Sequence, residues 1–360
     1  MAALASTLYT RLLDWVEDYI NSHLKLTQAV YGFTSHIVLL DLPGIADRPG
    51  RISDDFGTLL ANTTNEMLHH IVQKVLVQVE EGEASQDRLK LRYPSVQGNK
   101  GTLDGLLSLG GLVPVMNESS MNKTVFDPEL NRKVFEDKFC SSPDCHLVNG
   151  VVKVNHFWVQ VLYALEGMFE RNENFINPEI IQTLGSSSDE CLRSLFQFPL
   201  NGLGKVHFDE LGGDGVSYSQ TLAQQTILSR YKHWLNMLIQ TIFSTTTSYV
   251  FSFTSSATGG PTLTEQVEAL NIKEFTYVRK KGFPFRLSFA DFLRRFCFLA
   301  FEFDERVIAS KEHAQLLMLR LSIDGFECGK RKIFLKYYHI RDGHLWVEVI
   351  VKSVKKHASF

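Results

Sequence analysis

An apolar run that ends in an Asp-Leu-Pro-Gly turn, followed by a long amphipathic segment, is the feature that most limits how this 360-residue chain can fold. Residues 37–50 read IVLLDLPGIADRPG, and apolar side chains then recur every three or four positions from Phe56 to Val79. The first pattern predicts a short buried strand over 36–41, and the second predicts one long helix that ends near Gly82.

The composition excludes several classes of protein. Hydrophobic residues make up 44% of the chain, which is enough for a packed core, and 37 basic against 40 acidic residues give a formal net charge of -3. Such a chain has no overall basic field, so we expect no nucleic acid as a partner. The five cysteines are odd in number and far apart, which favours reduced thiols and a cytoplasmic location. No apolar run reaches the roughly 20 residues of a spanning helix, so we expect no membrane insertion.

Other stretches predict further helices and strands. Apolar side chains at helical spacing predict a helix over residues 3–25 with one stripe on a core. The stripe consists of Leu4, Leu8, Leu12, Trp15 and Tyr19. The remaining expectations are short helices in a loop-rich stretch at 83–125, strands within 151–165, a helix at 178–196 opened by Asn177 and Pro178, a helix at 221–243 and a strand at 249–253.

The turn after the predicted strand is similar to a nucleotide switch. In P-loop nucleotidases an Asp at a strand end helps to hold magnesium and a nearby Gly offers its N–H to the γ-phosphate, and Asp41 and Gly44 are suitably placed for this. Phosphate also needs a Gly-x-x-x-x-Gly-Lys-Ser/Thr cradle, and neither Gly204-Lys205 nor Gly329-Lys330 is followed by Ser or Thr. We therefore expect no hydrolysis by this chain alone. Two interpretations of the motif stay open, a plain strand-end turn and a dynamin-like GTPase site.

No metal site and no catalytic residue is expected. Cys140, Cys145 and His146 bring three zinc-type ligands together, but no second Cys/His pair lies at finger spacing. A loop with free thiols is the simpler interpretation. The sequence also lacks a Gly-x-Ser-x-Gly elbow, which argues against Ser-His-Asp catalysis.

Taken in order, the segments resemble the second half of a myosin motor (head) domain. LASTLYTRLLDWVEDYINSHL is similar to the helix before the family's switch II strand, and IVLLDLPGIAD is similar to that strand, with Asp41 and Gly44 on matching positions. Ile45 and Ala46 stand where the family has Phe and the Glu that closes its nucleotide site. The resemblance therefore implies a vestigial nucleotide site at Asp41 and Gly44. DDFGTLLANTTNEMLHH then resembles the relay helix, with Phe56, Leu60, Asn65 and Glu66 in register.

Two further segments resemble the family's actin-facing subdomain. GLLSLGGLVPVMNESSMNKTVF is similar to its lower-domain segment, which implies actin-binding residues at Gly105, Leu106, Leu107, Thr124 and Phe126. Residues 154–196 are similar to the segment that follows, with His156 and Tyr163 in register. The Gly-rich stretch 198–220 takes the place of loop 2, but its single lysine, Lys205, weakens the expected charge contact with acidic actin.

The C-terminal part resembles the converter. YVRKKGFPFRLSFADFLRRFCFLA carries Gly282, Phe283, Pro284 and Arg286 on the family's positions. FLKYYH is similar to the converter exit of class III and class XVI myosins. The sequence has no Ile-Gln motif, so the resemblance implies no light chain.

The resemblance implies a mixed, helix-rich α/β chain, with a partial myosin-motor fold of the P-loop NTPase class and a small converter subdomain. The expected parts are a helix and switch II-like strand at 1–46, a relay helix and lower actin-binding-like subdomain at 47–196, a loop 2-like linker at 197–225, a helix, sheet strand and connecting helix at 226–281, a converter-like subdomain at 282–345 and a basic tail at 346–360.

The function implied is that of a degenerate, noncatalytic myosin-head-like protein. ATP and magnesium are the family's cofactors, but the sequence contains neither a phosphate loop nor switch I, so we expect no cofactor to bind. Actin filaments or other cytoskeletal proteins are the expected partners, with a cytoskeleton-associated place in the cytoplasm. The alternative is a C-terminal part of an active ATP-driven actin motor.

Overall fold

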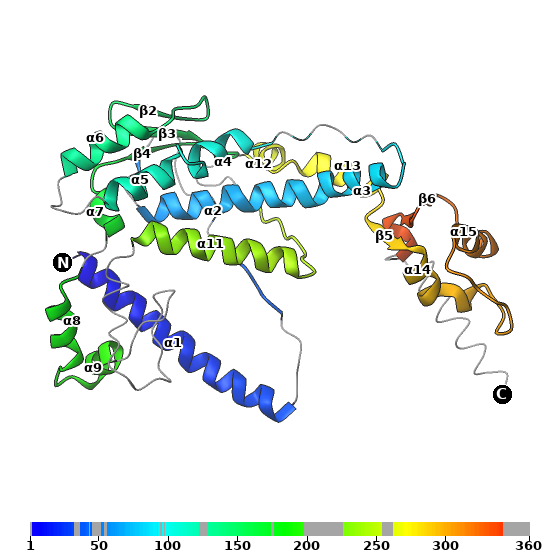
Figure 1. Cartoon of the computed structure of the whole chain (residues 1–360), viewed down its shortest axis with the longest axis horizontal. Helices are drawn as coiled ribbons and strands as arrows, with labels where there is room; N and C mark the ends of the chain where they lie inside the picture. The colour runs from blue at the N-terminus through cyan, green and yellow to red at the C-terminus, as the bar shows by residue number, and fades with distance from the viewer. Residues whose placement is uncertain are drawn as a thin grey trace. The chain divides into compact units, whose positions relative to one another are not determined.

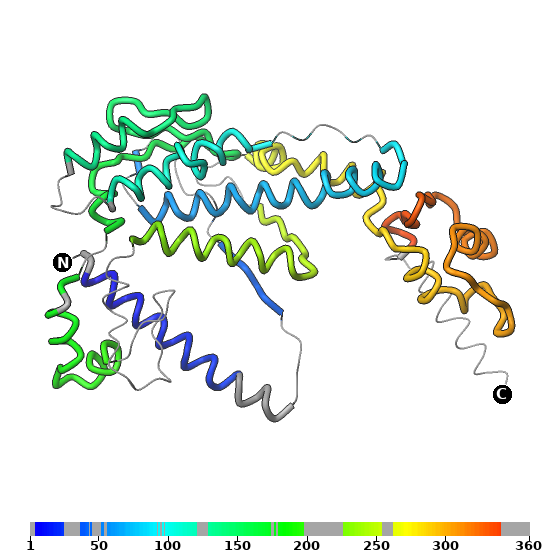
Figure 2. The backbone as a smooth tube through the Cα atoms, in the orientation of Figure 1, coloured from blue at the N-terminus to red at the C-terminus, as the bar shows by residue number. Residues whose placement is uncertain are grey.

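The computed structural model describes residues 2–31, 37–42, 44, 52–53, 56–91, 93, 96, 98–121, 128–173, 176–197, 226–253 and 262–340 (Figure 2). The chain forms two compact units, and each is described by itself. The first unit comprises Met1–Met67 and Asn99–Val250, and the second comprises Leu68–Gly98 and Phe251–Phe360. In the part of the chain that is described, no helix combines the length and apolar character that crossing a bilayer requires.

A four-stranded sheet in the order β1-β4-β3-β2 forms one layer of the first unit (Figure 1). Its strands are β1 (Ile52–Ser53), β2 (Cys145–Val148), β3 (Val151–Asn155) and β4 (Gln160–Ala164). Strand β3 pairs antiparallel with both β2 and β4, while β1 runs parallel to β4. Asn149 and Gly150 join β2 to β3 with φ angles of 50° and 76°, as a tight two-residue hairpin requires. The strands predicted within 151–165 are confirmed.

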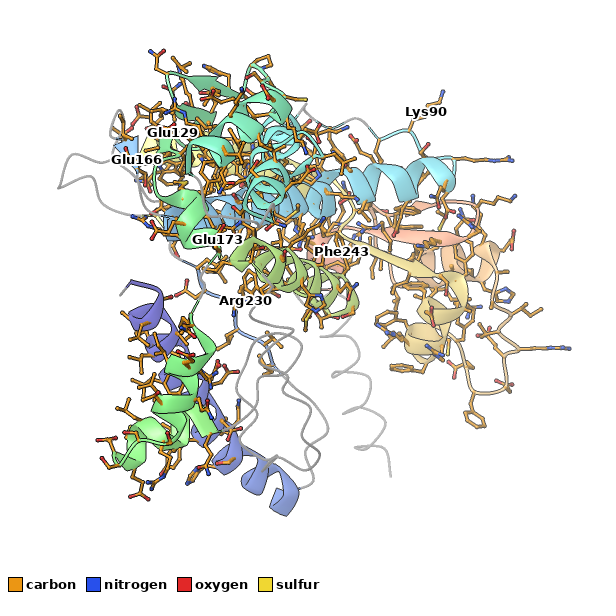
Figure 3. The ribbon with its side chains drawn as sticks, turned by 60° about the vertical axis from the view of Figure 1, so that its left-hand side comes forward. Lys90, Glu129, Glu166, Glu173, Arg230 and Phe243 are labelled. Carbon is orange, nitrogen blue, oxygen red and sulfur yellow. The ribbon has the colours of Figure 1, made fainter. Side chains whose placement is uncertain are left out.

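Helices cover this sheet and extend from it. The start of α2 (Phe56–Gln73) lies beside α11 (Ile227–Ser244), and the hydroxyls of Thr64 and Tyr231 hydrogen-bond between them at 3.0 Å (Figure 1). Figure 3 shows α11 from Arg230 near its start to Phe243 near its end. The other described helices of this unit are α1 (Ala2–Tyr31), α4 (Lys100–Leu107), α5 (Leu112–Met121), α6 (Pro128–Lys138), α7 (Met168–Glu173), α8 (Pro178–Gly185) and α9 (Glu190–Gln197).

The core of the first unit lies between the sheet, α2 and helices α4 to α7. Its fully enclosed side chains come from all of these elements and include Leu59, Leu106, Met116, Phe135, Tyr163 and Met168. Burial of an apolar side chain of this size stabilises a fold by about 1.5–3 kcal/mol. This shared core fixes the helices against the sheet.

The second unit starts within the long helix and contains a small α/β module. The helix continues from α2 through a π-helical turn, η1 (Lys74–Gln78), into α3 (Val79–Gln86). The module has an antiparallel sheet in the order β5-β7-β6. Its elements, and the two helices before it, are α12 (Leu263–Ala269), α13 (Ile272–Lys281), β5 (Phe285–Ser288), α14 (Phe289–Phe296), η2 (Cys297–Leu299), α15 (Lys311–Arg320), β6 (Glu327–Cys328), β7 (Lys332–Leu335) and α16 (Tyr337–Ile340).

The module has its own core. On α14 the buried residues Phe289, Phe292, Leu293 and Phe296 follow the three-or-four spacing of a helix with one apolar face. That face packs with α15 and β7 in one hydrophobic cluster. The sequence pattern and the packing therefore agree, and the mixed, helix-rich α/β class predicted for the chain is confirmed.

The long helix begins where the pattern predicts and ends later than predicted. Helix α2 starts at Phe56, and helical backbone continues to Gln86, four residues past Gly82. A glycine inside a helix costs only about 1 kcal/mol relative to alanine, so it does not have to end one. The last turns are held by tertiary contacts, because Glu80 and Glu83 of α3 bind the Phe283 backbone N–H and the Arg286 side chain.

Two predicted strands are absent from the described residues. Residues 37–41 belong to no sheet, and Ile37 and Leu39 are 90% and 91% exposed. Residues 249–253 are also outside any sheet. A strand needs a neighbour for its N–H and C=O groups, and a run of apolar residues does not show whether a neighbour exists. The predictions of a buried strand over 36–41 and of a strand over 249–253 are wrong for the described positions.

The stripe predicted on the first helix is covered only in part, since Leu4 and Leu8 are half-buried and the other three residues are exposed. Helix α1 packs against α9, where Arg11 is buried and donates a hydrogen bond to the Leu195 carbonyl at 2.8 Å. Leu12, Trp15 and Tyr19 are 43%, 41% and 56% exposed. Helical spacing predicted the helix correctly, but it could not show which face meets a neighbour.

The helix predicted over 178–196 consists of two helices. Asn177 opens α8 as predicted, because its side chain accepts a backbone N–H bond at 3.0 Å. The chain leaves the helix at 186–189, and Asp189 accepts the N–H of Leu192 at 2.9 Å at the start of α9. Ser and Asp side chains compete for backbone N–H groups, which explains the break. For α11, the predicted first turn at 221–225 lies outside the described residues.

Alanine should have opposite effects at two glycines. At Gly150 the positive φ strains any other residue, and a new Cβ would lie 2.7 Å from the Arg132 side chain, so G150A should lower the free energy of unfolding by about 1–2 kcal/mol. Gly82 has helical backbone, and a Cβ added there would meet no atom within 4 Å. G82A should therefore raise the free energy of unfolding by about 0.5–1 kcal/mol. Urea unfolding followed by circular dichroism measures both, and shifts of the same sign would contradict these conformations.

Candidate functional site

The predicted nucleotide residues lie on an exposed stretch. Asp41 and Gly44 are both exposed, and a Cβ placed on Gly44 would meet no atom within 4 Å. Among the described residues, Asp41 makes no hydrogen bond or ion pair. Among the described residues, the structure therefore brings no group that could hold a phosphate together with Asp41 and Gly44.

The predicted actin-binding residues on α4 serve the core of the first unit. Leu106 is fully buried, Leu107 is half-buried, and a Cβ on Gly105 would lie 2.4 Å from the Cys145 Cβ. Glycine at 105 thus lets α4 approach β2 closely. Leu109, just after the helix, is 92% exposed. Thr124 and Phe126 lie outside the described residues.

The cysteine loop shows no metal geometry. Cys140 is exposed, whereas Cys145 is buried at the start of β2, and burial raises the pKa of its thiol to about 12. A protonated thiol is a poor metal ligand. Over the described ranges, no three His, Cys, Asp or Glu side chains are grouped so that they could hold a metal ion.

A buried polar network joins α2 to the sheet of the first unit. Glu66 on α2 accepts hydrogen bonds from the Phe157 backbone N–H at 2.7 Å and from the Asn99 side chain at 2.5 Å. His156 Nδ1 lies 3.0 Å from the same carboxylate. The side chains of Glu66 and His156 are both fully buried. A buried carboxylate needs such a set of donors, since the loss of water would otherwise cost several kcal/mol.

The network continues through the imidazole to a tyrosine. His156 Nε2 lies 2.8 Å from the Tyr163 hydroxyl, which also accepts a hydrogen bond from Asn62 at 2.7 Å. These bonds are all satisfied if His156 carries its proton on Nδ1 and the Tyr163 hydroxyl donates to Nε2. All the groups are enclosed, so the network positions α2, β3 and β4 and offers no reactive group to a substrate.

A second set of contacts fixes the converter-like module to the end of the long helix. Glu80 is 2% exposed and accepts hydrogen bonds from the Phe283 backbone N–H and from the Tyr93 hydroxyl. Its other oxygen lies 3.5 Å from the Arg286 guanidinium. A Cβ on Gly282 would lie 2.3 Å from the Glu80 carboxylate, so glycine is required by close approach. The pKa of Tyr93 is raised by burial and by the Glu80 carboxylate that it donates to.

Two more carboxylates of the same helix end reach the module. Glu83 pairs with Arg286 at 2.9 Å and with Lys332 at 3.1 Å. Burial acts to raise its pKa, but the hydrogen bonds from these two cations outweigh that effect and lower it. Asp87 accepts the backbone N–H groups of Arg331 and Lys332 at 3.1 and 2.7 Å.

The Asp87 carboxylate is almost enclosed. Its side chain is 1% exposed, and a Cβ on Gly329 would lie 2.5 Å from it. Burial opposes ionisation, but the backbone and side-chain hydrogen bonds of Arg331 outweigh it and lower the pKa of Asp87. The three carboxylates together clamp the start of β5 and the start of β7 to α3.

The four predicted converter residues therefore lie together. Gly282, Phe283 and Arg286 surround Glu80, and half-buried Pro284 lies between them. Phe283 packs edge-on against Phe334 with ring centroids 6.2 Å apart.

We call the contacts of Glu80, Glu83 and Asp87 with the module the junction. The sequence analysis did not predict these three acidic partners. Glu80, Glu83 and Asp87 fall in the last turns of a helix, where the helix dipole disfavours negative charge. Acidic residues at such positions indicate that cations or N–H groups from elsewhere compensate them. That signal was present in the sequence, but it does not name the partners.

Comparisons with known proteins agree with these observations. The family model described as the myosin head (motor domain) matches residues 1–336. This chain belongs to the myosin head family. The family's fold is of the P-loop NTPase type, which confirms the fold class.

Several curated myosins are similar to the chain. "Neither inactivation nor afterpotential protein C" of Drosophila melanogaster is 29% identical over 387 residues, which cover 98% of this chain and 25% of that protein. Myosin-IIIb of Mus musculus is 24% identical over 389 residues, which cover 98% of this chain and 29% of that protein. Unconventional myosin-XIX of Xenopus laevis is 26% identical over 315 residues, which cover 82% of this chain and 30% of that protein. The chain spans less than a third of the length of each of these relatives.

Removal of the buried charge at Glu66 should destabilise the first unit. In E66Q the new amide group faces the Asn99 donor and weakens the bond to His156, so we expect a loss of about 2–4 kcal/mol in unfolding free energy. The exposed Glu166, labelled in Figure 3, provides the matched control. E166Q should change the free energy of unfolding by less than about 0.5 kcal/mol. Urea unfolding measures both variants, and equal effects would show that the network is not stabilising.

The junction should give the second unit an acid-sensitive stability. The lowered pKa values of Glu83 and Asp87 mean that both carboxylates contribute stability above their ordinary pKa of about 4, and that this contribution is lost as pH falls through the lower folded values. D87N should lower stability at pH 7 and should flatten its decline between about pH 5 and 2. Thermal melts across this range test the expectation, and an unchanged acid limb would contradict it.

Proposed function

We propose that this chain is a noncatalytic, myosin-head-like protein that corresponds to the C-terminal half of a degenerate motor domain. It binds actin filaments weakly or serves as a cytoskeletal scaffold. The observation that carries the proposal is the family match over residues 1–336 in a sequence without a Gly-x-x-x-x-Gly-Lys-Ser/Thr cradle. Such a cradle supplies the backbone N–H groups and the lysine that neutralise a nucleotide phosphate, and the sequence contains no motif that would form one.

The proposed loss of nucleotide chemistry fits the state of the switch II-like segment. Asp41 and Gly44 keep the family's residue types, but Ala46 stands where the family has its closing Glu. Both residues are exposed and follow an unpaired stretch. We regard them as vestigial, with neither ATP nor magnesium bound by this chain.

The proposed scaffold role rests on how firmly the converter-like module is attached. Glu80, Glu83 and Asp87 hold it through ion pairs with Arg286, Lys332 and Arg331. Three backbone N–H groups, those of Phe283, Arg331 and Lys332, also donate to these carboxylates. Such a junction positions a rigid module without any chemical step. Gly282, Phe283, Pro284 and Arg286 are its proposed converter residues.

The proposed actin contact lies around α4 of the first unit. Gly105, Leu106 and Leu107 would support this surface from within, while Leu109 presents an exposed apolar side chain beside it. Thr124 and Phe126 complete the proposed set. A weak affinity is expected, since the loop 2-like stretch has one lysine in place of a basic cluster. Other cytoskeletal proteins could share the surface, and we place the protein in the cytoplasm with the cytoskeleton.

Co-sedimentation and turnover assays on the purified chain test both halves of the proposal. We expect weak pelleting with F-actin at micromolar concentration, reduced by added salt, and no ATP hydrolysis above background. L109D should reduce pelleting several-fold, whereas the control E166Q should not. Turnover at the rate of a working motor would overturn the noncatalytic half, and a lack of pelleting would overturn the actin half. Calorimetric binding of GTP with magnesium would instead favour the GTPase interpretation of residues 41–44.

A further inference from the structure

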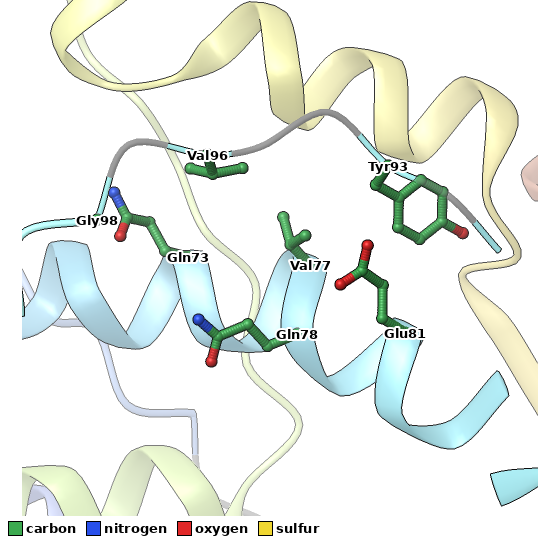
Figure 4. Close-up of a pocket in the computed structure, with 7 residues that line it drawn as sticks. All are labelled: Gln73, Val77, Gln78, Glu81, Tyr93, Val96 and Gly98. Carbon is green, nitrogen blue, oxygen red and sulfur yellow. The ribbon is translucent and has the colours of Figure 1, made fainter. Parts of the chain in front are cut away.

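A hollow of about 330 Å³ lies beside the π-helical turn of the second unit (Figure 4). Val77 and Glu81 point from the helix toward the segment that carries Tyr93 and Val96. The volume is within the range of pockets that take small organic molecules. Local π-helical geometry is also frequent at functional sites.

The walls of the hollow are held in place by contacts outside it. The Tyr93 hydroxyl donates to Glu80, which fixes the phenol ring at one end. At the other end, the Gln73 amide hydrogen-bonds the His69 ring at 2.8 Å. Val77 between them is buried and gives the hollow an apolar floor. Tyr93 and Gln73 are thus held at the two ends of the hollow before any ligand binds.

One carboxylate, that of Glu81, is among the described residues that line the hollow. Residues 80–87 contain four acidic side chains, and three of them bind cations or N–H groups of the module. Glu81 makes no hydrogen bond or ion pair within the described part of the chain, and it lines the hollow. No lysine or arginine is among the described lining residues. Among these described lining residues, Glu81 is the charged group, and its carboxylate is complementary to a positive charge.

We propose that this hollow binds a small organic cation, with its ammonium group beside Glu81 and its apolar body between Val77 and Val96. Gln78 also lines the hollow, and its side-chain amide is a second polar group there. The face of the Tyr93 ring adds a cation–π contact. The site does not depend on the proposed cytoskeletal function.

Three probes of one shape and different charge test the site on the full chain. Calorimetry or ligand-observed NMR compares 2-phenylethylamine with the neutral 2-phenylethanol and the anionic 3-phenylpropionate. We expect the amine to bind at least about tenfold more tightly than the alcohol, and the anion not to bind. Equal affinity for amine and alcohol, or no binding of the amine at millimolar concentration, would overturn the proposal.

Variants separate a site from non-specific attraction. E81Q keeps the shape and should weaken amine binding about tenfold while alcohol binding stays unchanged. E166Q removes the same charge from an exposed site in the other unit and should have no effect. V96W should block the hollow and remove both ligands, with circular dichroism to verify the fold. Equal weakening by E81Q and E166Q would mean that the amine senses only net charge, and it would refute the site.

Discussion

Two carboxylates buried on one long helix are the constraint on which the rest of the structure depends. Glu66 in the first unit and Glu80 in the second are 0% and 2% exposed. Each accepts a backbone N–H from a phenylalanine far along the chain, Phe157 and Phe283. An ionised carboxylate removed from water costs several kcal/mol unless donors surround it, so the segments that bring those donors are fixed in place.

The two environments show what this chain has kept. The network around Glu66 ties the helix to a sheet, and the contacts of Glu80, Glu83 and Asp87 tie a small α/β module to the helix end. Both are positioning devices built from matched charges and hydrogen bonds. The segment at Asp41 and Gly44, in contrast, is exposed and unpaired. In the described part of this myosin-family chain, the buried contacts of Glu66 and Glu80 organise the framework, and Asp41 and Gly44 take no part in them.

Sequence patterns predicted the elements whose signal is local. The helix start at Phe56, the cap at Asn177 and the strands within 151–165 depend on side-chain spacing and capping within a few residues. The predicted strand was wrong at the described positions 37–41, and the predicted stripe of α1 is only partly covered, because both predictions needed a neighbour that the pattern cannot reveal. The resemblance predicted Gly282 and Phe283 as converter residues, but it did not indicate that Glu80 lies beside them.

By itself the sequence determined the long helix, the strands within 151–165, the family and the lack of a phosphate cradle, since each is written in contiguous residues. Only the tertiary structure decided that Glu66 meets His156 and that Glu80 meets Phe283, across 90 and 203 residues of chain. It also decided which apolar faces are covered. Pairing across such distances depends on packing and on the cost of buried charge, and neither is a property of a local stretch.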